Sequence, residues 1–229
     1  MTSLITKKMS SLFHYKMIIK KITKKDSRNV VIHFDNDEKL IINLEVFIKS
    51  GLRKGMGVSS DRFSFLVDEN KRYHIKLHAV RLLARRLHSE KELRTKLFQK
   101  RYEKRMINDV IEELKNKELL DDYKFALIFT EEKMRTKLWG EKKIKGELIK
   151  KGIARELIEQ VTKEKFPEGN KLNDAIALAE KKVKTLLYKN LERRKLAERI
   201  YSYLSSRGYD YETSRGAVEK VLNETLGDE

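Results

Sequence analysis

The chain has 229 residues, 40% of them hydrophobic, and a formal net charge of +17. This hydrophobic content supports folded cores and excludes a wholly disordered chain. The absence of cysteine excludes disulfides, thiolate metal sites and cysteine nucleophiles, and suits a reducing cytoplasm. No apolar run approaches the roughly 20 residues that span a bilayer, and the opening "MTSLITKKMSSLFHYK" lacks the apolar core of a secretory signal. We therefore expect a cytoplasmic protein without a membrane partner.

The first part of the chain is predicted to form a small sheet. The segments "MIIKKI", "NVVIHF" and "KLIINL" alternate with period two and are rich in β-branched residues, and "DNDE" between the last two favours a hairpin turn. A short helix should follow and end near Gly51, where glycine can adopt a left-handed cap. Ser59–Asp61 is a candidate start for a further element, and residues 63–67 fit either a strand or a helix. We expect this β-rich module to occupy residues 1–72.

From His74 the hydrophobic period changes to 3.6, which indicates helices. The first predicted helix has an apolar stripe made of Val80, Leu83, Ala84 and Leu87. Ser89 and Glu92 form a capping box that should begin a second helix, running to about Lys100. A third helix is predicted over residues 103–115.

The three-helix pattern then recurs twice, which is typical of tandem repeats. Gly152 and Gly208 should end the second helices of the later repeats, whereas Arg101 stands at that place in the first and should tolerate a left-handed cap less well. The linker "FPEGNK" holds the only proline. The predicted fold is mainly α, with tandem three-helix repeats forming an elongated, curved body behind the small β-rich module. The predicted repeats are 73–120, 121–168 and 169–229.

Residues that could carry catalysis are few. His74 and His78 have the spacing of two metal ligands on one helical face, but no carboxylate joins them in a recognised pattern. A nuclease-like magnesium site could be imagined from Asp121, Asp122, Glu131 and Glu132. The first two have a sufficient role as helix caps, and the other two belong to a solvated helix. The glycines of "GLRKGMG" lack the Gly-Lys-Ser/Thr ending that would hold a nucleotide phosphate. The sequence thus predicts no metal, no cofactor and no enzyme.

The basic residues make a stronger case for binding. Residues 71–110 hold 13 Lys or Arg against 4 Asp or Glu, and such an excess favours a polyanion or an acidic protein surface as partner. A shift along the repeats superposes Lys91 on Lys142 and Arg94 on Lys145, so equivalent units should present equivalent cations on one face. The alternative is that the second helices are merely rich in solvated lysine. The candidate partner-binding and nucleic-acid-binding residues are Arg81, Arg85, Arg86, Lys91, Arg94, Lys100, Arg135, Lys142, Lys145, Lys151 and Arg207.

Aromatic side chains near these cations could stack on unpaired bases. They are Tyr102, Trp139, Tyr201, Tyr203 and Tyr209. Packing between helices is the favoured interpretation for most of them, and Trp139 should pin the turn before its helix.

The segments "RLLARRLHSEKELRTKL", "LLDDYKFA" and "WGEKKIKGELIKKGI" resemble those of the bacterial RecX regulatory family. "NVVIHFDNDEKLIINLEVFIKSGLRKG" resembles the β-rich N-terminal extension of its longer members. The resemblance covers nearly the whole chain. It implies tandem three-helix repeats that bind the RecA recombinase in the groove of its filament on DNA and modulate strand exchange, ATP hydrolysis and coprotease activity in recombination, repair and the SOS response.

The expected function is therefore that of a monomeric RecA regulator, with inhibition as the expected sign, that also touches single- and double-stranded DNA by nonspecific electrostatic contact. The alternative is a sequence-nonspecific nucleic-acid-binding repeat protein without a recombinase partner, for which the net charge alone would suffice.

Overall fold

A computed structural model describes residues 16–167 and 171–227. The predicted absence of a signal in the first residues and part of the predicted "FPEGNK" linker lie outside the described residues. The described residues divide into two compact units, one made of residues 16–82 with 97–112 and the other of residues 83–96 with 113–167 and 171–227. The division falls at the end of α3 (Ser60–Leu83) and within the helices α4 (Glu90–Gln99) and α5 (Lys104–Asn116). None of the helices in the described part is long and apolar enough to cross a membrane.

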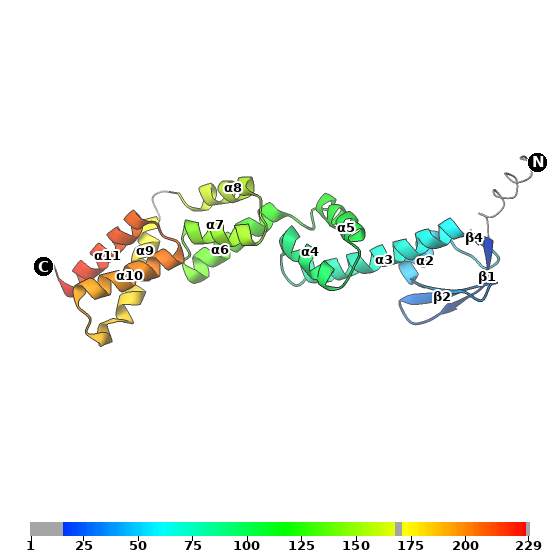
Figure 1. Ribbon diagram of the computed structural model, residues 1–229, viewed down its shortest axis with the longest axis horizontal. Coiled ribbons are helices and arrows are strands. Elements are labelled where there is room, and N and C mark those ends of the chain that lie inside the picture. Colours follow the sequence, from blue (N-terminus) through cyan, green and yellow to red (C-terminus); the bar gives the residue numbers. More distant parts are fainter. Residues whose placement is uncertain (1–15, 168–170, 228–229) are drawn as a thin grey trace, which may run out of the picture. The chain divides into compact units, whose positions relative to one another are not determined.

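The first unit contains a four-stranded antiparallel sheet of order β3-β2-β1-β4 (Figure 1). Its strands are β1 (Lys16–Lys24), β2 (Asn29–Phe34), β3 (Lys39–Asn43) and β4 (Gly57–Ser59). The predicted hairpin of β2 and β3 is confirmed. The short helix α2 (Leu44–Ser50) ends at Gly51, whose φ of 66° confirms the predicted left-handed cap.

The long helix α3 (Ser60–Leu83) begins fourteen residues earlier than the change of period predicted. Its first turn is capped by Ser59, whose Oγ accepts from the Arg62 amide at 3.2 Å, and residues 63–67 are helical. Leu66 packs into the sheet core with Ile19 and Ile32. Because α3 is continuous, the predicted boundary at residue 72 lies within a helix, and the division into four modules stays a prediction.

The prediction that Val80, Leu83, Ala84 and Leu87 form the apolar stripe of this helix is wrong. The buried residues of α3 are Leu66, Ile75 and Ala79, while Val80 is 37% exposed. Ala84 is exposed and, like Leu87, lies beyond the end of the helix. A helix whose polar residues cover most of its circumference gives a weak period, so the stripe was assigned to the wrong residues.

The second unit contains the two later three-helix groups, as predicted (Figure 1). One group consists of α6 (Asp122–Lys137), α7 (Glu141–Lys150) and α8 (Arg155–Lys165). The other consists of α9 (Lys171–Lys184), the short 3-10 helix η1 (Leu187–Lys189), α10 (Arg193–Arg207) and α11 (Tyr211–Leu226). Each group has its own apolar core, the first around Ile144 and Leu148 and the second around Ile200 and Leu204.

The predicted helix ends are confirmed at several residues. Asp121 caps α6 by accepting from the Lys124 amide at 3.0 Å. Gly152 and Gly208 have φ values of 79° and 94°, the left-handed region that glycine enters without steric cost. Arg101 also takes this conformation, with a φ of 60°.

Candidate functional site in the second helices

The second helices of consecutive repeats meet end to end inside the second unit. At what we call the first joint, the start of α4 contacts the end of α7. Ser89 Oγ donates to the Lys151 carbonyl at 2.7 Å, and Lys91 Nζ donates to the Lys150 carbonyl at 3.1 Å. Lys151 Nζ lies 2.6 Å from Glu92 Oε1. The last carbonyls of a helix lack intrahelical partners, so these donors satisfy groups that would otherwise need water.

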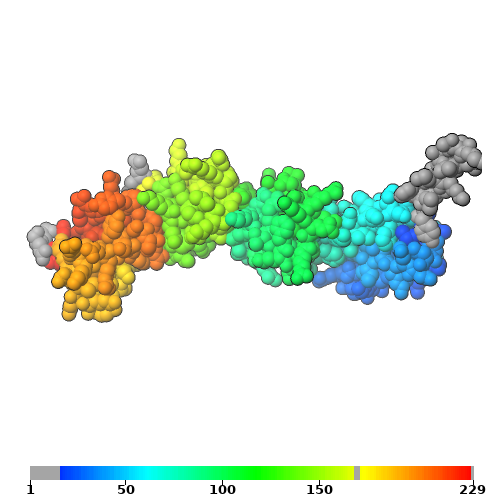
Figure 2. Space-filling view, viewed as in Figure 1, coloured from blue at the N-terminus to red at the C-terminus, as the bar shows by residue number. Residues whose placement is uncertain are grey.

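The second joint repeats this arrangement between the start of α7 and the end of α10. The Gly140 amide donates to the Arg207 carbonyl at 2.8 Å, and the Lys142 amide donates to the Gly208 carbonyl at 3.2 Å. The surfaces of α10 and of the α6–α8 group meet closely in Figure 2. Free amides of one helix thus meet free carbonyls of the next, which also places the positive end of one helix dipole against the negative end of another.

The close approach explains the glycines. A Cβ on Gly208 would lie 2.3 Å from the Lys143 amide nitrogen, and a Cβ on Gly140 would lie 2.7 Å from the Gly208 carbonyl oxygen. A Cβ on Gly152 would lie 2.6 Å from Lys91 Cδ. The left-handed conformation alone does not demand glycine, since Leu138 holds a φ of 48°. The joints, then, are what require residues without side chains.

Most of the cations that recur in phase are engaged in these joints or in ion pairs. Arg94 Nε lies 2.7 Å from Glu90 Oε1 and is half-buried. Lys145 pairs with Glu159 at 2.9 Å and with Glu141 at 3.0 Å. Hydrogen bonds to Glu159 and then Glu141 raise the pKa of Lys145.

Two further candidate binding residues also have partners within the chain. Arg86 pairs with Glu92 at 2.8 Å. The Arg207 guanidinium lies 5.0 Å from the Tyr203 ring centroid and donates to the Tyr203 hydroxyl at 3.1 Å. Burial alone would raise the pKa of Glu92, but hydrogen bonds from Lys151 and Arg86 outweigh it and hold that pKa below its usual value. The Lys151 pair thus links two repeats, whereas the contacts of Arg86 with Glu92 and of Arg207 with Tyr203 lie within one repeat.

Five predicted residues remain exposed, with side chains that form no hydrogen bond or ion pair to any other residue in the described ranges. They are Arg81, Arg85, Lys100, Arg135 and Lys142. Arg81 and Lys100 belong to the first unit and the other three to the second. These five are available to a partner.

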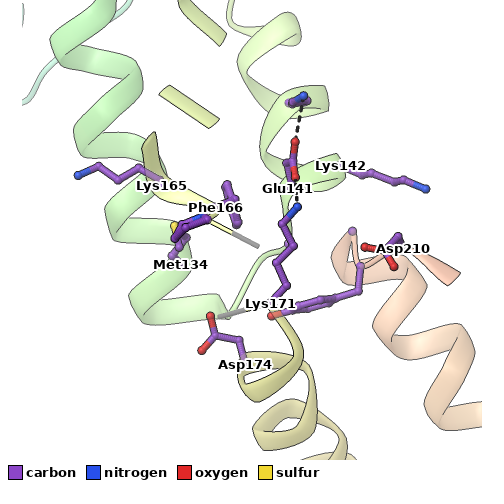
Figure 3. A pocket seen from close by; sticks show the side chains of 13 residues that line it. Met134, Glu141, Lys142, Lys165, Phe166, Lys171, Asp174 and Asp210 are labelled. Atoms are coloured by element: carbon purple, nitrogen blue, oxygen red, sulfur yellow. Dashed lines mark hydrogen bonds and ion pairs between the residues drawn. The ribbon is translucent and has the colours of Figure 1, made fainter. Parts of the chain in front are cut away.

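A pocket of about 230 Å³ lies at the second joint (Figure 3). Lys171 Nζ lies 2.8 Å from Glu141 Oε2 at its wall, and Lys165 pairs with Glu131 at 2.6 Å. The Lys142 side chain points away from the pocket in Figure 3. Because its lysines at positions 165 and 171 are already neutralised, this pocket offers little charge to a ligand.

The carboxylates considered for a magnesium site do not converge. Asp122 Oδ1 accepts from the Glu90 amide at 2.8 Å, so it caps α4, and burial raises its pKa. Glu132 pairs with Lys133 at 2.7 Å. No group of three or more His, Asp or Glu side chains that could hold a metal ion occurs among residues 16–167 and 171–227.

Trp139 and Tyr209 pack within the helical groups, in agreement with the interpretation favoured from the sequence. Trp139 contacts the Phe129 ring with centroids 6.3 Å apart, and Lys137 lies 5.1 Å from the Trp139 ring centroid. Tyr209 is buried and donates to the Leu138 carbonyl at 3.1 Å. Burial raises the pKa of its phenol.

The partners of the joints were missed by sequence reasoning. Ser89 was predicted as a cap, and its Oγ does accept from the Glu92 amide at 3.2 Å. Its second contact, to Lys151, joins residues 62 positions apart in the sequence. Gly140 and Gly152 at the two ends of α7, together with Gly208 at the end of α10, were the one available signal that backbones meet there.

Comparisons with known proteins agree with this repeat structure. Family models described as the first and second three-helix domains of RecX match residues 76–114 and 121–161. A crystal structure of regulatory protein RecX superposes with a TM-score of 0.73 at 19% identity, covering 90% of this chain and 99% of that chain. A RecX structure from Lactobacillus salivarius gives a TM-score of 0.60 at 23% identity, covering 67% of this chain and 97% of that one. At such identities the two structures show a shared fold.

Curated relatives extend the similarity along most of the sequence. A regulatory protein RecX of Clostridium botulinum (strain Alaska E43 / Type E3) is 29% identical over 202 residues, which span 88% of this chain and 94% of that protein. The regulatory protein RecX of Clostridium perfringens (strain 13 / Type A) is 30% identical over 203 residues, again 88% of this chain and 94% of that protein. With both three-helix domains matched in order and this identity along most of both chains, the chain belongs to the RecX family of regulatory proteins.

Proposed function

We propose that this protein binds the filament that a RecA recombinase forms on DNA and inhibits its strand exchange, ATP hydrolysis and coprotease activity. Membership of a regulatory family supports the proposal. A net charge of +17 favours an assembly that contains nucleic acid, because cations that neutralise phosphates release bound counterions. The proposal places this action in the cytoplasm, in keeping with a chain without cysteine.

The observation that carries the proposal is the separation of the basic residues into paired and exposed sets. The paired cations of the joints are held by carboxylates and carbonyls of the same chain, as Lys151 is by Glu92. The exposed cations, for example Arg85, Arg135 and Lys142, have no such partner in the described part of the chain. We assign Arg85, Arg135 and Lys142 to the contact with the filament, where they would meet phosphate or acidic side chains without reading base sequence.

The test measures the ATPase and strand-exchange rates of a RecA filament with and without the protein at rising salt. Binding to the same DNA without recombinase is measured in parallel by fluorescence anisotropy. Inhibition of the filament supports the proposal. Tight binding to bare DNA with no effect on the filament ATPase would replace it with the nonspecific nucleic-acid-binding function.

A charge-reversal variant tests the assignment of residues. Replacing Arg85, Arg135 and Lys142 by Glu should weaken filament binding and reduce the slope of log affinity against log salt by about 2 to 3, because each lost phosphate contact removes about 0.7 to 0.9. The matched control replaces Lys25, Lys54 and Lys220, which are also exposed, and changes the net charge equally. Equal losses in the two variants would show that only the total charge matters.

A further inference from the structure

The first unit contains a pocket of about 590 Å³ between α3 and the turn that joins α4 to α5. Arg81 lines one side, and Arg101 and Tyr102 line the other. The size falls within the roughly 300 to 1,000 Å³ common for small-ligand sites. It lies at the end of the second helix of the first repeat, the place that corresponds to Gly152 and Gly208 in the later repeats.

In the later repeats this place is filled by the start of another second helix. Lys91 lies over Gly152, and the Lys143 backbone lies over Gly208. In the first repeat the corresponding residue is Arg101, which holds a φ of 60° and carries a long side chain. A helix could not approach Arg101 as closely as α7 approaches Gly208, because the arginine side chain would occupy its space. At the end of this second helix the first repeat therefore presents a cationic side chain, where the later repeats have a glycine in contact with another helix.

The charges around the pocket favour an anion. Lys71 Nζ is paired with Glu103 Oε1 at 3.1 Å, so these two residues largely cancel. Arg81 and Arg101 are exposed, and neither guanidinium forms a hydrogen bond or ion pair with another described residue. Two unengaged guanidinium groups leave a net positive pocket, and the planar guanidinium fork binds phosphate through two parallel hydrogen bonds.

An aromatic pair lies beside these cations. The His78 and Tyr102 rings meet edge to face, with centroids 6.0 Å apart. Both residues are half-buried, and Tyr102 lines the pocket, so part of its ring is open to a ligand. Aromatic rings next to cations provide a face on which a nucleobase stacks. The pocket thus combines the two chemical elements that recognise a nucleotide.

We propose that this pocket binds a phosphate group carried by a nucleotide, with Arg81 and Arg101 on the phosphate and Tyr102 against the base. The nucleotide is either free or part of a nucleic-acid strand, since both present the same chemistry. The proposal does not depend on the action on a recombinase filament, because it concerns the isolated protein.

The experiment titrates the full-length protein, without recombinase, with sodium pyrophosphate, ATP and a fluorescein-labelled single-stranded oligonucleotide, using calorimetry and anisotropy. The Arg81→Gln, Arg101→Gln double variant should lose about tenfold or more in affinity for the ligand that occupies the pocket. A Lys25→Gln, Lys54→Gln variant changes the net charge equally at exposed positions of the same unit and should lose far less. Tyr102→Leu should weaken ATP or the oligonucleotide more than pyrophosphate, and circular dichroism checks that each variant is folded.

The outcomes separate the sources of the phosphate. A selective loss of ATP binding identifies a free nucleotide, and a selective loss of oligonucleotide binding identifies a strand. Equal losses of ligand affinity in the arginine and lysine variants would overturn the proposal that this pocket is the binding site. The absence of binding to pyrophosphate, ATP and the oligonucleotide alike would also overturn the proposal.

Discussion

Lys151 Nζ lies 2.6 Å from Glu92 Oε1, so the last turn of α7 is tied to the first turn of α4 by a short ion pair. The two side chains are only 24% and 20% exposed. Lys151 also lies over the Phe129 ring, 5.1 Å from its centroid. A basic residue that recurs in phase along the repeats thus serves the contact between repeats, which changes what its mutation should do.

Glu92→Gln should lower the free energy of unfolding of the second unit by about 1 to 2 kcal/mol, because two partly buried cations, Lys151 and Arg86, lose a charged partner. Urea unfolding followed by circular dichroism measures the change. Glu198→Gln is the control, since its pair with Arg194 is largely exposed and should contribute almost nothing. Equal destabilisation by the two variants would show that the Glu92 pairs contribute no more to stability than an exposed ion pair does.

The second unit should lose stability in acid. Burial opposes ionisation of Glu90, Glu92 and Glu141, but hydrogen bonds from basic partners outweigh it, so their pKa values lie below the usual 4.5. A carboxyl with a lowered folded pKa contributes stability that is complete above its unfolded pKa and is lost as pH falls through the folded value. The pKa of Asp122 is raised by burial, so this residue contributes in the opposite direction.

We therefore expect the midpoint of thermal unfolding to fall as pH drops from about 5 toward 3. The Glu92→Gln, Glu141→Gln double variant should show a shallower fall over the same range, since two of the contributing carboxyls are absent. A fall as steep as that of the unchanged protein would mean that other carboxylates dominate acid unfolding.

Alanine substitutions at three glycines distinguish the cost of a left-handed backbone from the cost of a steric clash with neighbouring atoms. Gly51→Ala should cost about 1 kcal/mol, because its φ is 66° but nothing lies within 4 Å of the added Cβ. Gly208→Ala should cost about 2 to 4 kcal/mol, since the added Cβ would also meet the Lys143 backbone. Gly152→Ala should fall between them, as it meets only the movable Lys91 side chain. Thermal melts rank the three, and a Gly208→Ala cost no greater than that of Gly51→Ala would contradict the second joint.

Lys142 and Lys145 lie on the same helix, so substitutions at these two lysines can be compared directly. Lys145→Glu should destabilise the protein, because the new carboxylate would face Glu141 and Glu159. Lys142→Glu should leave stability within about 0.5 kcal/mol of the unchanged protein, as the exposed Lys142 side chain has no partner among the residues described. The reverse order in urea unfolding would show that the paired and exposed sets are wrongly assigned.

The sequence predicted much of the fold because local rules govern it. Alternation gave the hairpin of β2 and β3, and Asp121 and Gly152 marked helix ends by capping chemistry that acts within a few residues. Ser59–Asp61 was a candidate start, but the helix between there and His74 was not predicted, because only Leu66, Ile75 and Ala79 are buried along the 24 residues of α3, too few to set a clear period.

The site was harder to predict. Phase along the repeats identified Lys91 and Lys145, but phase cannot distinguish a cation that faces a partner from one that holds the next repeat. That distinction depends on carboxylates and carbonyls far along the chain, such as Glu92 for Lys151, 59 residues away. Long-range pairing of this kind leaves no periodic trace in one sequence.

The second joint also gives the protein an internal reporter of its own opening. Amides in the first turn of a helix ordinarily exchange with solvent quickly, because no carbonyl of their own helix reaches them. The Gly140 and Lys142 amides are instead bonded to the carbonyls of Arg207 and Gly208. Their deuterium uptake therefore records how often α7 and α10 part while both helices remain folded, and a ligand that bends or straightens this junction would reveal itself as a change in two exchange rates.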